Sequence, residues 1–140
     1  MQYWLMKSEP NVFSFDDLVA KGERGEEWDG VRNYQARNFM RDMKLGDRGF
    51  FYHSNIGKEV VGILEVVALA HPDSTTDDPR WECVDVKAVA PLVQPVTLEA
   101  VKAEPRLKDM VLVNNSRLSV QPVTPEEWRV ILEMAGGIRE

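Results

Sequence analysis

The chain has few of the residues that cross-link small proteins or hold metal ions. Its 140 residues include one cysteine, Cys83, and two histidines, His53 and His71. A single cysteine cannot form an internal disulfide and fits a reducing compartment. Three such residues, far apart in the sequence, make a structural zinc site improbable. We therefore predict neither a metal site nor a cofactor.

Long apolar runs and leader-like segments are also missing. No stretch of about 18 apolar residues occurs, so we expect no membrane-spanning helix. Residues 1–10, MQYWLMKSEP, have no basic region followed by an apolar one, so we expect no secretory signal. The expected location is the cytoplasm, with association to the nucleoid or, in a eukaryote, the nucleus. The sequence also lacks GxGxxG and GxxxxGK[ST], which argues against the usual phosphate-binding loops. It lacks GxSxG, which argues against a serine hydrolase of that type.

Positive charge is scarce overall but concentrated in one segment. The chain has 17 basic and 23 acidic residues and a net charge of −6, which opposes a basic coat for non-specific nucleic-acid binding. Residues 32–58 contain six basic and two acidic residues, a formal charge of +4 that leaves −10 elsewhere. Such a run is often only a solvated helix face. The alternative is a phosphate-contacting edge beside an aromatic pocket.

The hydrophobic pattern predicts one α+β domain covering residues 1–140. A content of 44% hydrophobic residues is typical of a globular chain of this length. Short strands that do not alternate regularly with long helices favour a small mixed, mostly antiparallel β-barrel with flanking helices. We predict strands at 2–7, 49–54, 60–70, 82–89 and 118–120, and helices following Ser14, following Asn33, at 97–103 and following Thr124.

Two features of the sequence could carry chemistry. Trp28 lies in the polar segment EEWDG without apolar neighbours, so we expect it at a pocket rim and not in the core. His53 and Ser54 are adjacent on a predicted strand, where successive side chains point to opposite faces. They therefore do not form a nucleophile and base in the usual geometry, and we predict no enzymatic activity.

Several segments of the sequence resemble the EVE domain family. They are YWLMKSEP at 3–10, WDGVRNYQARNFMR at 28–41, FFYHSN at 50–55, VVGILEV at 60–66, PRWECVDV at 79–86 and NSRLSVQPVT at 115–124. The resemblance covers nearly the whole chain. It implies a PUA-like fold related to the YTH and ASCH domains. It also implies a reader of modified bases in DNA or RNA, and not an enzyme.

The resemblance also nominates site residues. Matching positions in YTH domains place Glu9 against the base and Trp28 as one aromatic wall, and the region that ends in Trp81 supplies the second wall. The base-binding set is then Lys7, Ser8, Glu9, Trp28, Asp29, Asn33, Tyr52, His53, Ser54 and Trp81. The residues expected to contact phosphates are Arg32, Arg37 and Arg117.

The sequence therefore predicts a monomeric, non-catalytic module that captures one flipped or unstacked base. C5-modified cytosine and methylated adenine are both candidates, and an ionised Glu9 would favour a base with an amino group. Two alternatives stay open at this point. One is an enzyme that modifies or hydrolyses nucleic acid. The other is a small-molecule or protein-interaction module on the same fold.

Overall fold

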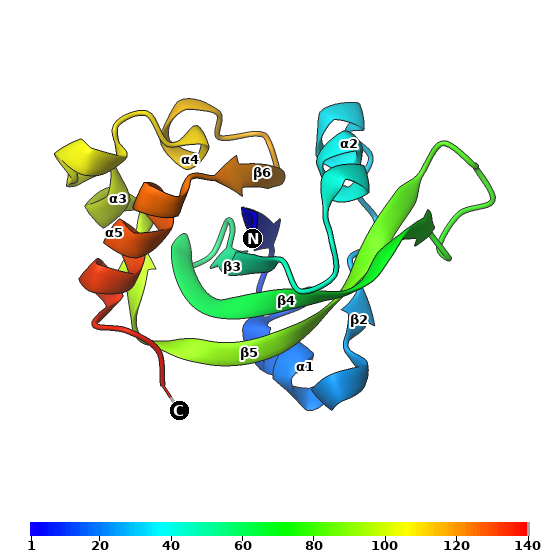
Figure 1. The fold of residues 1–140 in the computed structure, drawn as a ribbon, viewed down its shortest axis with the longest axis horizontal. Helices are drawn as coiled ribbons and strands as arrows, with labels where there is room; N and C mark the ends of the chain where they lie inside the picture. Colours follow the sequence, from blue (N-terminus) through cyan, green and yellow to red (C-terminus); the bar gives the residue numbers. More distant parts are fainter. Residues whose placement is uncertain (140) are drawn as a thin grey trace.

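The protein forms one six-stranded sheet with helices packed against it, as a computed structural model of residues 1–139 shows (Figure 1). The sheet order is β2-β5-β4-β3-β1-β6. The strands are β1 (Tyr3–Ser8), β2 (Glu26–Glu27), β3 (Arg48–His53), β4 (Glu59–Pro72), β5 (Glu82–Thr97) and β6 (Val120–Val123). The helices are α1 (Phe15–Ala20), α2 (Tyr34–Asp42), α3 (Leu98–Ala103), α4 (Val111–Asn114) and α5 (Pro125–Ala135), with 3-10 turns η1 (Gly22–Arg24) and η2 (Pro105–Leu107).

The sheet is mixed and mostly antiparallel, as predicted, but it is not closed into a barrel. Only β1 and β3 are parallel, and no ladder joins the edge strands β2 and β6 within residues 1–139. The long strands β4 and β5 curl strongly around the middle of the molecule (Figure 1). Their ladder changes register at four points, and such bulges bend and twist a strand pair. The sheet is therefore curved and open.

The two longest strands extend beyond their predicted ends. β4 has 14 residues and β5 has 16, so the β4–β5 hairpin is the longest feature of the sheet. Pro91 and Pro95 make the second half of β5 look unlike a strand. Beyond the short pairing with β2 at Asp85 and Val86, the outer edge of β5 meets residues 137–139 through the Val93 N–H and the Pro91 carbonyl. This edge contact needs no N–H from either proline.

Helix caps are where the sequence predictions are most accurate. Ser14 and Thr124 each form the capping box at the start of α1 and α5. Gly136 ends α5 in the left-handed conformation, which glycine adopts without steric cost. The last strand starts later than the predicted 118–120, since β6 begins at Val120 and pairs with β1.

The sheet is buried on both faces, so the domain has two hydrophobic clusters. Alternate residues of β1 divide between them, with Trp4 and Met6 on one side and Leu5 on the other. The first cluster packs under α1 and α2, and the second under α3, α4 and α5. At Gly62, a Cβ atom would lie 2.4 Å from the Phe15 ring, so glycine is needed where α1 meets β4.

Candidate functional site

A cavity of about 430 Å³ opens beside the carboxyl end of β1, next to β2 and the segment leading to α2. This volume lies in the range typical of small-molecule pockets. Backbone and side chains from four separate segments line it: Lys7, Ser8, Val12, Phe13, Glu26, Glu27, Trp28, Asp29, Gly30, Val31, Arg32 and Ser119.

Trp28 forms a wall of this cavity and is also part of the core. It is only 7% exposed, and its ring meets the Phe51 ring edge-on with 5.3 Å between centroids. Its backbone N–H donates to the Val84 carbonyl, which ties it to β5. The prediction that Trp28 lies outside the core is wrong. The polar neighbours face outward or into the cavity, while pairing of β2 with β5 carries the indole over the sheet.

Asp73, which the sequence reasoning missed, holds the segment after Trp28 in place. Its buried carboxylate accepts hydrogen bonds from the Gly30 N–H at 2.9 Å and from Arg32 Nη1 at 3.1 Å, and also from Thr75. Burial acts to raise the pKa of Asp73, but these hydrogen bonds lower it to about 2. Nothing in the turn-rich segment HPDSTTDDPR distinguishes this carboxylate from its acidic neighbours.

The cavity wall is rich in hydrogen-bond acceptors. Glu26, Glu27 and Asp29 line it together with two cations, Lys7 and Arg32. Hydrogen bonds from Ser74 are the main cause that lowers the pKa of Glu27. Partial burial, followed by the nearby Asp73 and Glu27 carboxylates, raises the pKa of Asp29. Such a wall suits a ligand that offers N–H donors, and it does not suit a phosphate group inside the cavity.

Five of the predicted base-binding and phosphate-contacting residues line this cavity: Lys7, Ser8, Trp28, Asp29 and Arg32. Tyr52 and Ser54 line a neighbouring cavity of about 220 Å³, which also includes Lys7. The Lys7 ammonium donates to the Ser116 carbonyl at 2.8 Å and lies 5.8 Å from the centre of the Tyr52 ring. Lys7 lines both cavities, so this cation lies at the boundary between them. Burial lowers the pKa of Lys7.

Three other predicted residues line neither cavity and have local partners. Glu9 is exposed and accepts a hydrogen bond from the Asn55 side chain. Asn33 caps α2 by accepting from the Ala36 N–H at 2.8 Å. His53 accepts from the Phe15 N–H through Nε2 at 3.1 Å. The contacts of Glu9 and His53 join segments far apart in the sequence and are not revealed by a linear motif, whereas the Asn33 cap is local.

Trp81 also lines neither cavity. It stacks on Tyr34 with 5.0 Å between ring centroids, and the Arg32 guanidinium lies 5.5 Å from the centre of the Trp81 ring. The Arg37 guanidinium lies 4.9 Å from the centre of the Tyr34 ring and donates to the Arg80 carbonyl. These residues form an aromatic and arginine stack where the start of α2 meets the β4–β5 loop.

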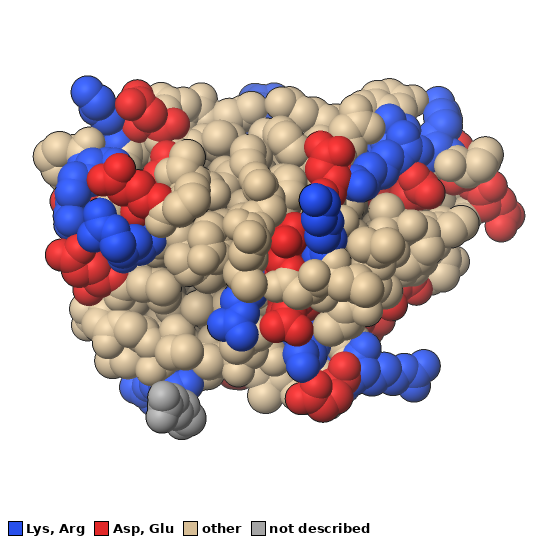
Figure 2. All heavy atoms as spheres, viewed as in Figure 1, with Lys and Arg blue, Asp and Glu red and all other residues tan. Residues whose placement is uncertain are grey.

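Three of the six basic residues of the segment 32–58 form ion pairs with acids elsewhere in the fold. Arg32 pairs with Asp73, Arg41 with Glu82 and Arg48 with Glu65. Because β4, β5 and their loop supply these acids, half of the predicted basic segment is neutralised by neighbouring strands. Figure 2 shows basic and acidic side chains intermixed on the face that it presents.

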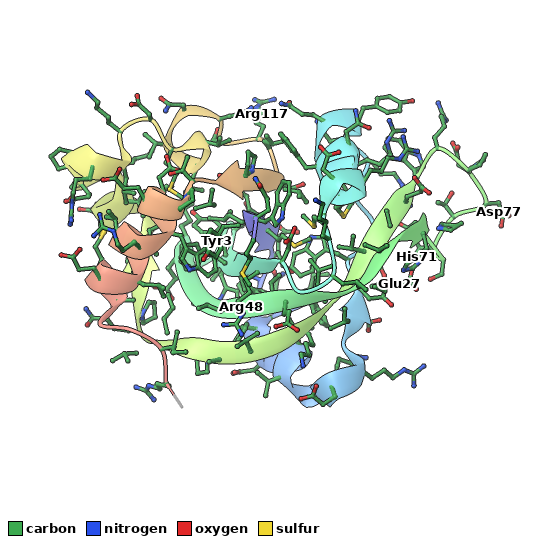
Figure 3. All side chains as sticks on the ribbon, viewed as in Figure 1. Tyr3, Glu27, Arg48, His71, Asp77 and Arg117 are labelled. Carbon is green, nitrogen blue, oxygen red and sulfur yellow. The ribbon has the colours of Figure 1, made fainter. Side chains whose placement is uncertain are left out.

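Arg117 is placed differently from the paired arginines. It is exposed on the loop before β6, at the upper edge of the molecule (Figure 3). It lies between Ser116, which lines the smaller cavity, and Ser119, which lines the larger one. In the sequence, Arg117 therefore lies between a residue that lines the smaller cavity and one that lines the larger cavity.

The fold and the cavity together define a class of protein. An open, curved, mixed sheet with helices on both faces and an indole-walled cavity at the end of its first strand is a PUA-like domain. The chain belongs to the EVE domain family, whose model matches residues 2–134. Within residues 1–139, no helix has both the length and the apolar character needed to cross a membrane.

Relatives of known sequence and structure support this assignment. Mouse thymocyte nuclear protein 1 is 42% identical over 164 aligned residues, which cover 94% of this chain and 73% of the mouse protein. A crystal structure of an Agrobacterium tumefaciens protein is 60% identical, with a TM-score of 0.96 and coverage of 98% and 94% of the two chains.

Two structural relatives were solved with nucleic acid. Human THYN1 in complex with DNA containing 5-methylcytosine is 39% identical, with a TM-score of 0.89 and coverage of 96% of this chain and 98% of the human chain. A YTH domain of Zygosaccharomyces rouxii MRB1, in complex with N6-methyladenosine RNA, is 18% identical. Its TM-score is 0.58, with coverage of 96% and 86%, and this likeness concerns the fold alone.

Proposed function

We propose that this protein is a non-catalytic nucleic-acid-binding domain that holds one modified base, C5-methylated cytosine first among the candidates, in the Trp28 cavity. The observation that carries the proposal is the arrangement of an indole beside three carboxylates in a cavity of suitable size. Membership of a family that includes a protein solved with 5-methylcytosine DNA supports the choice of ligand.

In this proposal, different cavity residues make different contacts with the base. A base must leave its stack to be enclosed, and Trp28 offers it a new stacking partner worth about 1–3 kcal/mol. Carboxylates accept hydrogen bonds from the amino group of cytosine but face the O4 carbonyl of thymine with repulsion. Asp29 is our choice for this contact because it lines the cavity, whereas Glu9 does not. A buried methyl group adds about 0.8 kcal/mol.

Phosphates are held outside the acidic cavity in this proposal. Arg32 is at the cavity wall, Arg37 is above the adjoining Tyr34 ring, and Arg117 is on the loop beside both cavities. Two or three phosphate contacts predict a shallow salt dependence, with a log–log slope of about −1.5 to −2.5. The domain acts as a monomer and works in a compartment that contains nucleic acid, as the name of its nuclear relatives suggests.

Binding of short single-stranded oligonucleotides with one central 5-methylcytosine, cytosine or thymine tests the proposal. We expect the order 5-methylcytosine, cytosine, thymine for the wild-type protein. Asp29→Asn exchanges an acceptor for a mixed donor and acceptor, so the preference for cytosine bases over thymine should fall about ten- to a hundredfold. Glu9→Gln is the matched control and should leave the ratio unchanged. Equal affinities for all three oligonucleotides, or a ratio that changes only in Glu9→Gln, would refute the assignment.

A further inference from the structure

A cluster of metal-ligating side chains lies directly behind the cavity wall. Glu27, His71 and Cys83 each place one donor atom within 4.8 Å of the other two, and these atoms are a carboxylate oxygen, an imidazole nitrogen and a thiol sulfur. The Cys83 thiol donates to Glu27 Oε1 at 3.4 Å. The Glu27 and His71 side chains lie together where β2 meets the loop end of the β4–β5 hairpin (Figure 3).

Strand register explains why residues so far apart in sequence meet. His71 on β4 pairs with Cys83 on β5, and Glu27 on β2 pairs with Asp85 on β5. Paired residues project from the same face of a sheet, and so do residues two positions apart on one strand. Three adjacent strands therefore present Glu27, His71, Cys83 and Asp85 on one face.

We propose that Glu27, His71 and Cys83 bind a divalent transition-metal ion, for which zinc is the best match. Thiolate, imidazole and carboxylate are the three ligand types that zinc takes in proteins, with bond lengths of about 2.0–2.3 Å. In tetrahedral geometry such bonds separate the donor atoms by roughly 3.3–3.8 Å. The 3.4 Å between Cys83 Sγ and Glu27 Oε1 already matches this spacing. A soft sulfur ligand also disfavours magnesium and calcium.

Asp85 provides the supporting contact that such a site needs. Its Oδ1 atom lies 2.7 Å from His71 Nε2. A carboxylate hydrogen-bonded to a ligand histidine fixes the ring orientation and raises its basicity. The other ring nitrogen, Nδ1, lies 3.0 Å from the Pro72 carbonyl, and in the proposed site it exchanges this contact for the bond to the metal ion.

Metal binding exchanges existing hydrogen bonds for metal–ligand bonds. The Cys83 S–H bond breaks, its proton leaves to solvent, and the sulfur forms a bond with the metal ion. The Glu27 carboxylate gives up its contact with the thiol. Cys83 is fully buried, but Glu27 and His71 are only half-buried, so the ion enters from their side. The bound ion joins the two-residue strand β2, and hence Trp28, to the hairpin.

Titration of the purified protein with cobalt(II) alone tests this proposal without any nucleic acid. We expect one equivalent to bind per chain, with a thiolate-to-cobalt absorption band in the near ultraviolet that excess zinc removes. Cys83→Ser should abolish the band, and His71→Gln should weaken cobalt binding at least tenfold. His53→Gln changes the other histidine, which lies outside the cluster, and should match the wild type.

Because Cys83 is buried, Cys83→Ser is checked for folding by circular dichroism, and the half-exposed His71→Gln decides the question if folding fails. No charge-transfer band in the wild type, or an unchanged cobalt affinity in His71→Gln, would overturn the proposal. Zinc should also raise the melting temperature of the wild type and not that of Cys83→Ser, since a ligand of the folded state stabilises it. Failure of base binding leaves these results unaffected.

Discussion

Trp28 and Trp128 are equally buried, at 7% exposure each, yet they belong to very different surroundings. Trp128 is sandwiched between the Tyr3 and Phe50 rings, with centroid distances of 4.3 and 4.0 Å. Within residues 1–139, Phe51 is the one aromatic ring that Trp28 meets, edge-on, and Trp28 borders the 430 Å³ cavity. Burial alone therefore does not separate a packing residue from a ligand wall. What separates them is how much of the ring other rings already cover.

The polar residues around the two indoles differ as well. Among residues 1–139, the recess beside Trp128 is lined by apolar residues and Arg48 without a carboxylate, whereas the cavity beside Trp28 has three carboxylates. Acceptors around an incompletely covered ring provide both stacking and directed hydrogen bonds for a base. The α5 side of the sheet serves packing, and in the proposed function the β2 side combines packing with base recognition.

The largest expected effect is the loss of stability in Trp128→Ala. Removing a ring stacked on both faces leaves a cavity and should cost about 3–5 kcal/mol of unfolding free energy. Chemical denaturation measures this cost. Below the denaturation midpoint, the folded protein should keep its affinity for a 5-methylcytosine oligonucleotide. A selective loss of affinity without loss of stability would reverse the roles assigned to the two indoles.

Asp73→Asn tests whether the Trp28 side of the sheet depends on the hydrogen bonds that the Asp73 carboxylate accepts. An amide has one acceptor oxygen where the carboxylate has two, so the contacts to Gly30 and Arg32 or those to Thr75 are lost. Hydrogen bonds to charged groups are worth about 1.5–3 kcal/mol, and we expect both unfolding free energy and base affinity to fall by amounts in this range. Asp78→Asn, in the same loop, is the control, since its carboxylate pairs with Arg80 outside the cavity and should change neither.

Trp28→Leu keeps an apolar side chain in place of the indole and removes the flat ring. It therefore separates base stacking from packing in the core. Affinity for the 5-methylcytosine oligonucleotide should fall about 5- to 150-fold, which corresponds to the 1–3 kcal/mol of base stacking. The same change at Trp128 should reduce the melting temperature and not the affinity. Unchanged binding by Trp28→Leu would show that the base lies elsewhere, for example in the smaller cavity beside Tyr52.

The smallest expected effect concerns His53 and pH. Burial lowers the pKa of His53 from its usual 6.5, although Glu59 and Asp16 act to raise it. The unfolded chain therefore binds the proton more tightly, so stability falls as pH drops from about 6.5 through the lowered pKa. His53→Gln keeps an acceptor for the Phe15 N–H but does not titrate. Its unfolding free energy should vary less with pH in this window, and an identical profile would contradict the sign of the shift.

Local patterns allowed much of the fold to be predicted. The capping boxes at Ser14 and Thr124 depend on residues three apart, and helix α2 follows from a period of 3.6. The close approach of Phe15 to Gly62 is not visible in a local pattern, because the two residues come from different elements. Strand ends were less accurate, since Pro91 and Pro95 lie on an outer edge of β5 whose contact with residues 137–139 uses the Pro91 carbonyl and the Val93 N–H.

The sequence by itself determined the family, the class of fold and the segments that contribute to the cavity, because these follow from contiguous motifs and short-range periodicity. The tertiary structure decided which side chains meet. Asp73 holds the Trp28 segment through Gly30 and Arg32, Trp81 stacks on Tyr34, and three of the four arginines of 32–58 pair with acids on β4, β5 and their loop. Glu27, His71 and Cys83 likewise came together only through strand pairing. Contacts of this kind depend on register between distant strands, which no local pattern in the chain specifies.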